Sequence, residues 1–209
     1  MKRAFSIVNE TWKRVWSKSL PRGADKRREI LLWDDLEKWA CISDEEIGGM
    51  SHAKLQTSSE TTLFHGRLST NTPAPDSTNK NRMKYSGYCA IRSQPNRGRF
   101  GRVKLYDFSQ YDALEFRLRG DGRKYIVNLQ IESYRRDDLW QAFLYTRGGP
   151  FWEKIQVDFS DFVLTNRGYL QDHQMSFSRE KVRTIGLLLA DRINGPFHLE
   201  LDYIKAIQK

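Results

Sequence analysis

From about residue 51 to the end of the chain, apolar side chains recur at every second position. In the segment 114–118, three apolar residues alternate with two charged ones, and the segment 197–203 repeats this pattern. A period of two places the apolar side chains on one face of a strand and the polar side chains on the other. The sequence therefore predicts β-strands with one buried face each.

Turn residues separate the alternating segments. Glycine, asparagine and proline cluster between them, at 120–122, 147–150, 166–168 and 194–196. Glycine and asparagine tolerate a positive φ and proline favours a turn, so each cluster indicates a loop. About nine or ten short strands without intervening amphipathic helices predict an all-β fold, an antiparallel β-sandwich or jelly roll. A parallel sheet would need helical crossovers, and the pattern offers none.

The first residues follow a different period. Apolar side chains spaced by three or four predict a short basic amphipathic helix within residues 1–20. We therefore expect a basic amphipathic N-terminal extension at 1–28 and a β-sandwich domain at 29–209. Three interpretations of the helix remain open: packing against the domain, docking on an anionic membrane or a partner, or a remnant of a targeting segment. The candidate docking residues are Phe5, Trp12, Lys13, Arg14 and Trp16.

The net charge of +9 is concentrated in two stretches. Residues 1–28 carry +7 and residues 80–104 carry +8, which leaves −6 for the rest of the chain. The second stretch interleaves basic residues with Tyr85, Tyr88 and Phe100, a mixture that nucleic-acid binding would use. The same mixture describes an ordinary strand between solvated basic loops, and no RNP motif is present, so we favour the strand and expect no nucleic-acid partner. Residues 69–84 are polar and contain proline, which predicts a mobile surface loop.

The sequence contains few of the motifs that catalysis, metal binding or phosphate binding requires. The four histidines have no metal-ligand spacing, and no nucleophile elbow or phosphate-binding glycine motif occurs. We therefore expect no enzyme activity, no catalytic residue, no metal and no cofactor. Cys41 and Cys89 are compatible with reduced thiols in the core or with one disulfide.

An aromatic pair allows a different function. Phe151 and Trp152 follow a tight Gly-Gly-Pro turn, and an exposed ring can stack on a sugar if hydrogen-bonding groups such as Arg147 or Asn166 lie nearby. A carbohydrate-binding β-sandwich module is therefore the alternative function. Trp152 can equally close the end of the sandwich as a core anchor.

Several strings resemble the complex I intermediate-associated protein family, in order and with similar spacing. They are WACISDEEIGGMS (39–51), SGYCAI (86–91), FSQY (108–111), LRGDGR (118–123), YTRGGPFW (145–152), TNRG (165–168), IGLLLAD (185–191) and GPFHLELDYI (195–204). The resemblance extends over residues 31–207.

The resemblance implies a galactose-binding-like jelly roll without enzymatic activity. It implies a non-enzymatic assembly factor, or chaperone, for mitochondrial respiratory complex I (NADH:ubiquinone oxidoreductase), located in the mitochondrial matrix and peripheral to the inner membrane. The implied partners are complex I subunits in assembly intermediates and other assembly factors, including an acyl-CoA dehydrogenase-like protein.

The family supplies no catalytic residues, but its recurring loops carry groups that could contact a protein partner. Arginine side chains in these loops can bind carbonyl or carboxylate oxygens of a partner, whereas the glycines around them suit architectural turns. The candidate protein-binding residues are Arg123, Arg147, Trp152, Asn166 and Arg167.

Overall fold

The computed structural model describes residues 29–31, 39–58, 61–71, 86–95, 97, 102–133, 135, 137–175 and 177–209. The N-terminal helix expected within residues 1–20, with its candidate docking residues, lies outside these ranges. So does most of the loop expected at 69–84.

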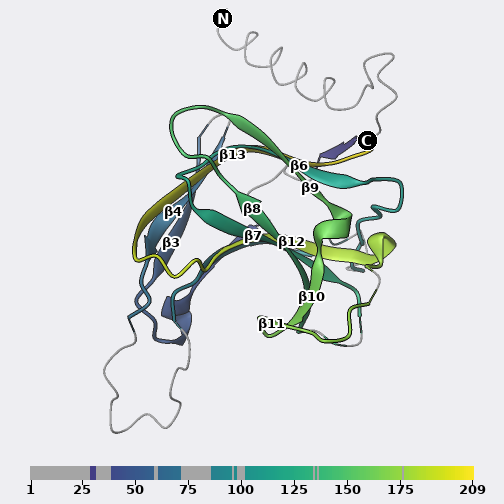
Figure 1. Cartoon of the computed structure of the whole chain (residues 1–209), viewed down its shortest axis with the longest axis horizontal. Coiled ribbons are helices and arrows are strands. Elements are labelled where there is room, and N and C mark those ends of the chain that lie inside the picture. The colour runs from purple at the N-terminus through teal and green to yellow at the C-terminus, as the bar shows by residue number, and fades with distance from the viewer. Residues whose placement is uncertain are drawn as a thin grey trace, which may run out of the picture.

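The described chain forms two antiparallel sheets and short 3-10 helices (Figure 1). The strands are β1 Glu29–Leu31, β2 Trp39–Ser43, β3 His52–Thr57, β4 Thr62–Leu68, β5 Cys89–Ser93, β6 Ala113–Arg119, β7 Lys124–Ile131, β8 Asp138–Tyr145, β9 Glu153–Asp158, β10 Val163–Asn166, β11 Tyr169–Leu170, β12 Val182–Leu189 and β13 Gly195–Ile207. The 3-10 helices are η2 Asp44–Ile47, η3 Phe159–Asp161 and η4 Arg179–Lys181. The predicted all-β sandwich is confirmed.

The two sheets differ in size and order. The smaller sheet has the order β3-β4-β13-β6-β9, with β1 paired to the far end of β13. The larger sheet has the order β11-β10-β8-β7-β12-β5-β2. In Figure 1 the larger sheet is arched, and its hollow side faces away from the smaller sheet.

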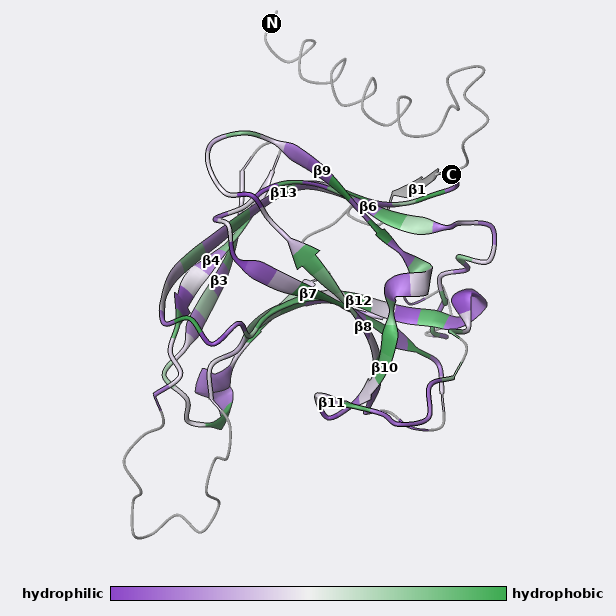
Figure 2. Cartoon of the chain, in the orientation of Figure 1, coloured by the Kyte–Doolittle hydropathy of each residue, from purple (hydrophilic) through white to green (hydrophobic). Residues whose placement is uncertain are grey.

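The alternation of the sequence is visible in the burial of the strands. In β6, Leu114, Phe116 and Leu118 are fully buried between the sheets, while Arg117 and Arg119 point outward and are partly exposed. In Figure 2 the hydrophobic colour runs along the strands of both sheets, whereas the 3-10 helices are mainly hydrophilic. The interior therefore consists of the inward-facing half of each strand, as the period of two predicts.

An aromatic cluster fills one end of the interior. Phe108 stacks on Phe159 with 5.5 Å between ring centroids, and Phe177 contacts both Phe162 and Trp140 at 6.1 and 5.8 Å. Aromatic pairs at these distances add stability beyond the area that they bury. Aromatic side chains therefore fill this end of the interior.

Both cysteines are free thiols on neighbouring strands of the larger sheet. Cys89 is fully buried, and burial, reinforced by the nearby carboxylate of Asp44, raises the pKa of its thiol to about 12. Burial also raises the pKa of Cys41. Since the thiolate is the reactive form, Cys89 is an inert part of the core at neutral pH.

Candidate interaction surface

A buried carboxylate joins two connections, β2–β3 and β4–β5, at the end of the sandwich opposite the aromatic cluster. The Asp44 side chain is fully buried and accepts hydrogen bonds from the Ser51 amide at 2.8 Å, from the Ser51 hydroxyl at 3.1 Å and from the Gly87 amide. The Ser51 hydroxyl also accepts a bond from the Ser69 amide at 3.0 Å. Asp44 thus fixes the β2–β3 loop to both ends of the connection between β4 and β5.

The glycine pair after η2 makes this arrangement possible. A Cβ atom on Gly49 would lie 2.2 Å from the Asp44 Cγ atom, and Gly48 has a φ of 89°. No side chain larger than hydrogen fits at Gly49, and the left-handed conformation at Gly48 favours glycine. The string from Asp44 to Gly49 is therefore an architectural unit.

Arg123 connects the remaining loops from the inside. Its guanidinium donates to Asp191 through Nε at 2.9 Å and Nη2 at 2.6 Å, and to the carbonyl oxygens of Ile193 and Pro196. Arg123 is 9% exposed and the Asp191 side chain 3%. Burial disfavours the charged guanidinium, but the bonds and charge of Asp191 outweigh it and raise the pKa of Arg123. The guanidinium of this candidate protein-binding residue is therefore bonded within the protein and does not face a partner.

Further bonds complete a continuous set of hydrogen bonds across this end, from Asp44 through Asn194 to Arg123 and Thr146, which we call the belt. The side chain of Asn194 accepts a bond from the Thr70 amide at 2.6 Å, which joins the β12–β13 loop to the β4–β5 connection. The Thr146 hydroxyl donates to the Arg123 carbonyl at 3.0 Å and accepts from the Gly122 amide at the same distance. The loops of both sheets are therefore connected at this end, and the surface that they present is preorganised.

The β8–β9 loop projects two large side chains from this belt. The Arg147 side chain is 90% exposed and lies 4.0 Å from Glu153, while Phe151 is 80% exposed. Arginine and aromatic residues are enriched among the residues that contribute most to protein–protein binding. The end of the sandwich thus offers a cation and an apolar ring on a rigid base.

Trp152 lies on the outer face of the smaller sheet and is partly buried there. The guanidinium carbons of Arg117 and Arg119 lie 5.3 and 5.2 Å from its ring centroid, within the range of cation–π contacts. Trp152 is therefore neither a core anchor nor an open aromatic platform, since two arginines already contact its ring.

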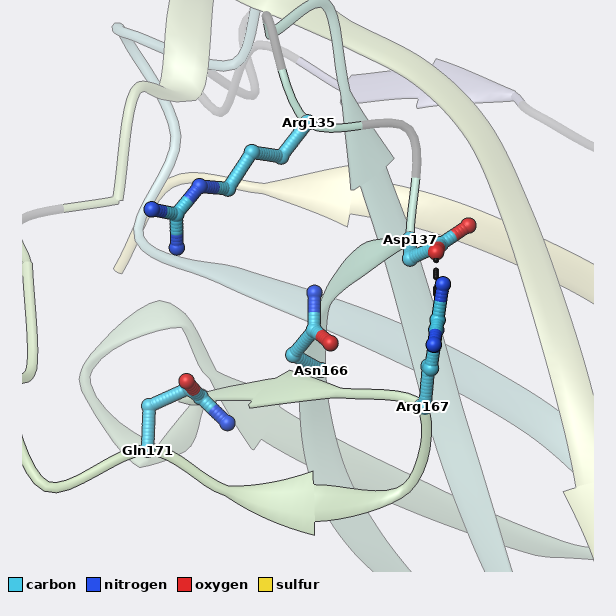
Figure 3. Close-up of a pocket in the computed structure, with 5 residues that line it drawn as sticks. All are labelled: Arg135, Asp137, Asn166, Arg167 and Gln171. Atoms are coloured by element: carbon cyan, nitrogen blue, oxygen red, sulfur yellow. Dashed lines mark hydrogen bonds and ion pairs between the residues drawn. The ribbon is translucent and has the colours of Figure 1, made fainter.

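The other two candidate residues lie at the opposite end of β8. Figure 3 shows Asn166 and Arg167 at an open polar pocket of about 370 Å³, lined also by Arg135, Asp137 and Gln171. Asn166 donates to Asp138 at 2.7 Å, and Arg167 donates to Asp137 at 3.0 Å. Asp138 begins β8 and Arg147 follows its end, so about 25 Å of strand separates the two places. The structure does not bring the five candidate residues into one site.

Sequence reasoning missed Asp44 and Asp191, the two carboxylates that organise the belt. Both lie inside strings that carry the family resemblance, but an aspartate in a loop gives no sign of its burial. Among the described residues, no group of three or more histidine, cysteine or acidic side chains is placed to hold a metal ion. Within the same ranges, no helix combines the length and apolarity that crossing a bilayer requires.

Comparisons with known proteins agree with this architecture. The solved structures that resemble the chain include the family 11 carbohydrate-binding module of the cellulase Lic26A-Cel5E of Clostridium thermocellum, with a TM-score of 0.56 at 15% identity, covering 90% of this chain and 97% of the module. The agarase AgWH50C has a TM-score of 0.51 at 11% identity, over 85% of this chain and 24% of the enzyme. These likenesses concern the fold alone.

Curated relatives give closer matches. The mouse protein "Complex I intermediate-associated protein 30, mitochondrial" is 38% identical over 176 residues, which are 82% of this chain and 52% of the mouse protein. The Drosophila melanogaster protein of the same name is 38% identical over 82% of this chain and 58% of its own length. The chain thus spans just over half the length of these relatives. The model of the complex I intermediate-associated protein 30 family matches residues 28–201. The chain belongs to the complex I intermediate-associated protein 30 (CIA30) family.

Proposed function

We propose that the chain is a non-enzymatic assembly factor for mitochondrial complex I and acts by binding assembly intermediates. The observation that carries this proposal is the family match, which spans residues 28–201 and so includes nearly the whole sandwich. Relatives from mouse and Drosophila melanogaster are named as mitochondrial proteins associated with complex I intermediates. The mechanism that we propose is that of a chaperone, which holds other proteins without transforming them.

The state of the buried acidic groups supports a binding role over catalysis. Glu115 accepts hydrogen bonds from Gln156 and Tyr203 at 2.9 and 2.8 Å. Asp44 and Asp191 are bonded within the belt. A general acid or base needs a carboxylate that can reach a substrate proton, whereas these carboxylates are occupied by the protein itself.

The partners that we propose are complex I subunits in assembly intermediates and other assembly factors, including an acyl-CoA dehydrogenase-like protein. We place the protein in the mitochondrial matrix, peripheral to the inner membrane. The basic segment 1–28 supports this location, because anionic lipids attract clustered lysine and arginine.

The contact surface that we propose is the belted end of the sandwich, with Arg147 and Phe151 as its central contacts. A rigid base lowers the entropy cost of binding, since the loops are already ordered before the partner arrives. The pocket at Asn166 and Arg167 is a second and separate polar surface.

A capture experiment tests this surface. The tagged chain, purified from solubilised mitochondria, should retain complex I subunits, and the double variant Arg147→Ala/Phe151→Ala should retain about tenfold less, because it loses an exposed cation and an exposed ring. Quantitative mass spectrometry of the captured subunits measures the effect. Lys154→Ala, an exposed change on the outer face of the smaller sheet, is the control and should capture normally.

Equal capture by the double variant and the wild type would exclude this end as the contact surface. Thermal melting of each variant checks that the fold is intact, since exposed substitutions are expected to change the free energy of unfolding by only about 0.5 kcal/mol. A glycan array tests the carbohydrate-binding alternative separately. Binding that is lost in Trp152→Ala would favour that alternative.

A further inference from the structure

The outer faces of the two sheets are built differently. On the smaller sheet, charged side chains pair with one another: Arg117 with Asp202, Arg119 with Glu200, and Lys205 with Glu115. A face of paired charges is typical of an antiparallel sheet with one side in water. The smaller sheet thus has an ordinary solvent-facing surface.

The outer face of the larger sheet carries an apolar row instead. Phe143 of β8 pairs with Ile126 of β7, which pairs with Leu188 of β12, then Ala90 of β5 and Ile42 of β2. Residues directly opposite each other in an antiparallel pair point to the same face, so these five side chains form one line across five strands. Phe143 is 54% exposed and the other four are partly exposed. We call this line the apolar row.

The charges beside the apolar row are basic. Lys124 is exposed, and its ammonium group lies 4.7 Å from the centroid of the Phe143 ring. Arg92 is exposed on the other side of the row, in the line of side chains that contains Gly186 and Asn128. None of the ion pairs found among the described residues involves Lys124 or Arg92, whereas Arg183 on the same face is neutralised by Glu132 at 3.0 Å. Glu45 and Glu46 are exposed acidic residues in the turn that follows β2.

The length and setting of the apolar row suit a helix. Five adjacent strands span four spacings, or about 19 Å, which is the length of about 13 helical residues. The row crosses the strands on the hollow side of the arched sheet (Figure 1). A helix of three to four turns presents anchors at positions i, i+3 or i+4, and i+7 along such a line.

We propose that the apolar row binds an amphipathic helix of a partner protein, with aliphatic anchors along the row and acidic residues on both flanks, one facing Lys124 and the other facing Arg92. This inference goes beyond the assembly role, because it defines the chemistry of the bound segment whichever complex supplies it.

Other occupants fit this face less well. A sugar stacks on flat aromatic rings. Phe143 and the neighbouring exposed Tyr145 lie at one end of the row, whereas Ile126, Leu188 and Ile42 along it are aliphatic. A second copy of the chain docked through the same face would bring its own Lys124 and Arg92 against these two charges. A flat bilayer contacts protruding side chains and does not follow a hollow face.

The test uses the full chain, isotope-labelled for NMR, and a synthetic helical peptide of about 14 residues with leucine anchors and glutamate flanks. We expect binding with chemical-shift changes confined to β8, β7, β12, β5 and β2. A matched peptide with lysine in place of glutamate should bind about tenfold more weakly, a factor that corresponds to about 1.4 kcal/mol.

Three variants sharpen the test. Leu188→Asn should weaken the acidic peptide about tenfold. Leu63→Asn is the matched control, because Leu63 is a partly exposed leucine opposite Glu200 on the outer face of the smaller sheet, and it should bind normally. Lys124→Glu should reverse the preference between the two peptides, which tests the row even if Leu188→Asn does not fold.

Several results would overturn the proposal. The first is that the acidic peptide does not bind at about 1 mM. The second is that the chemical-shift changes are centred outside the five strands, and the third is that Lys124→Glu leaves the preference for the acidic peptide unchanged. The proposal also fails if cellotetraose, vesicles of anionic lipid or self-association of the chain changes the chemical shifts of the apolar row while the acidic peptide does not.

Discussion

Replacing Arg123 by alanine should lower the free energy of unfolding by about 3–5 kcal/mol, because it leaves the buried Asp191 carboxylate without its partner. The change also removes the donors for the carbonyl oxygens of Ile193 and Pro196. Chemical denaturation, monitored by tryptophan fluorescence, measures the loss. The belt should open at the β12–β13 loop, so the amide of Thr70 should exchange faster with solvent.

Two controls separate this effect from a general loss of positive charge. Arg147→Ala removes an arginine that is 90% exposed and should change stability by only about 0.5 kcal/mol. The double variant Arg123→Met/Asp191→Leu should recover part of the loss, since replacing both members of a buried pair avoids an unpaired charge. An Arg123→Ala protein as stable as the wild type would show that this ion pair does not hold the loops.

Asp44→Ala should destabilise the protein by about 2–4 kcal/mol, because the buried amides of Ser51 and Gly87 lose their acceptor. Asp44 stabilises the loops where β2, β3 and β5 meet, whereas Arg123 stabilises the β12–β13 loop. Amide hydrogen exchange should show the loss of protection at Ser51 and Gly87 first. Denaturation curves give the size of the effect.

The neighbouring glutamates provide the control for Asp44. Glu45 and Glu46 are exposed acidic residues on the same 3-10 helix, and alanine at either position should leave stability almost unchanged. If Glu45→Ala were as destabilising as Asp44→Ala, the effect would belong to the charge of the turn and not to the buried bonds.

The sandwich could be predicted because several of its strands have one polar and one apolar face. β6 and β13 show the alternation over many residues, and both are found where the pattern places them. The pattern failed for β2, where apolar Ile42 points outward and Cys41 inward, so no period of two appears. β10 and β11 have four and two residues, too few to show any period.

The arrangement of the surfaces could not be predicted in the same way. Arg123 and Arg147 each border a glycine-containing turn in the sequence, yet one is buried and the other is 90% exposed. The difference depends on Asp191, which is distant in sequence and reaches Arg123 only through the β12–β13 loop. The apolar row likewise depends on the register of five strands, which local sequence does not specify.

The most direct test of the assembly role is the level of complex I in mitochondria after deletion of the gene, measured by native gel electrophoresis with mass spectrometry. Our account predicts that mature complex I is lost, that partial intermediates accumulate, and that the wild-type chain restores assembly. Complex I at its normal level in the deletion strain would contradict the account.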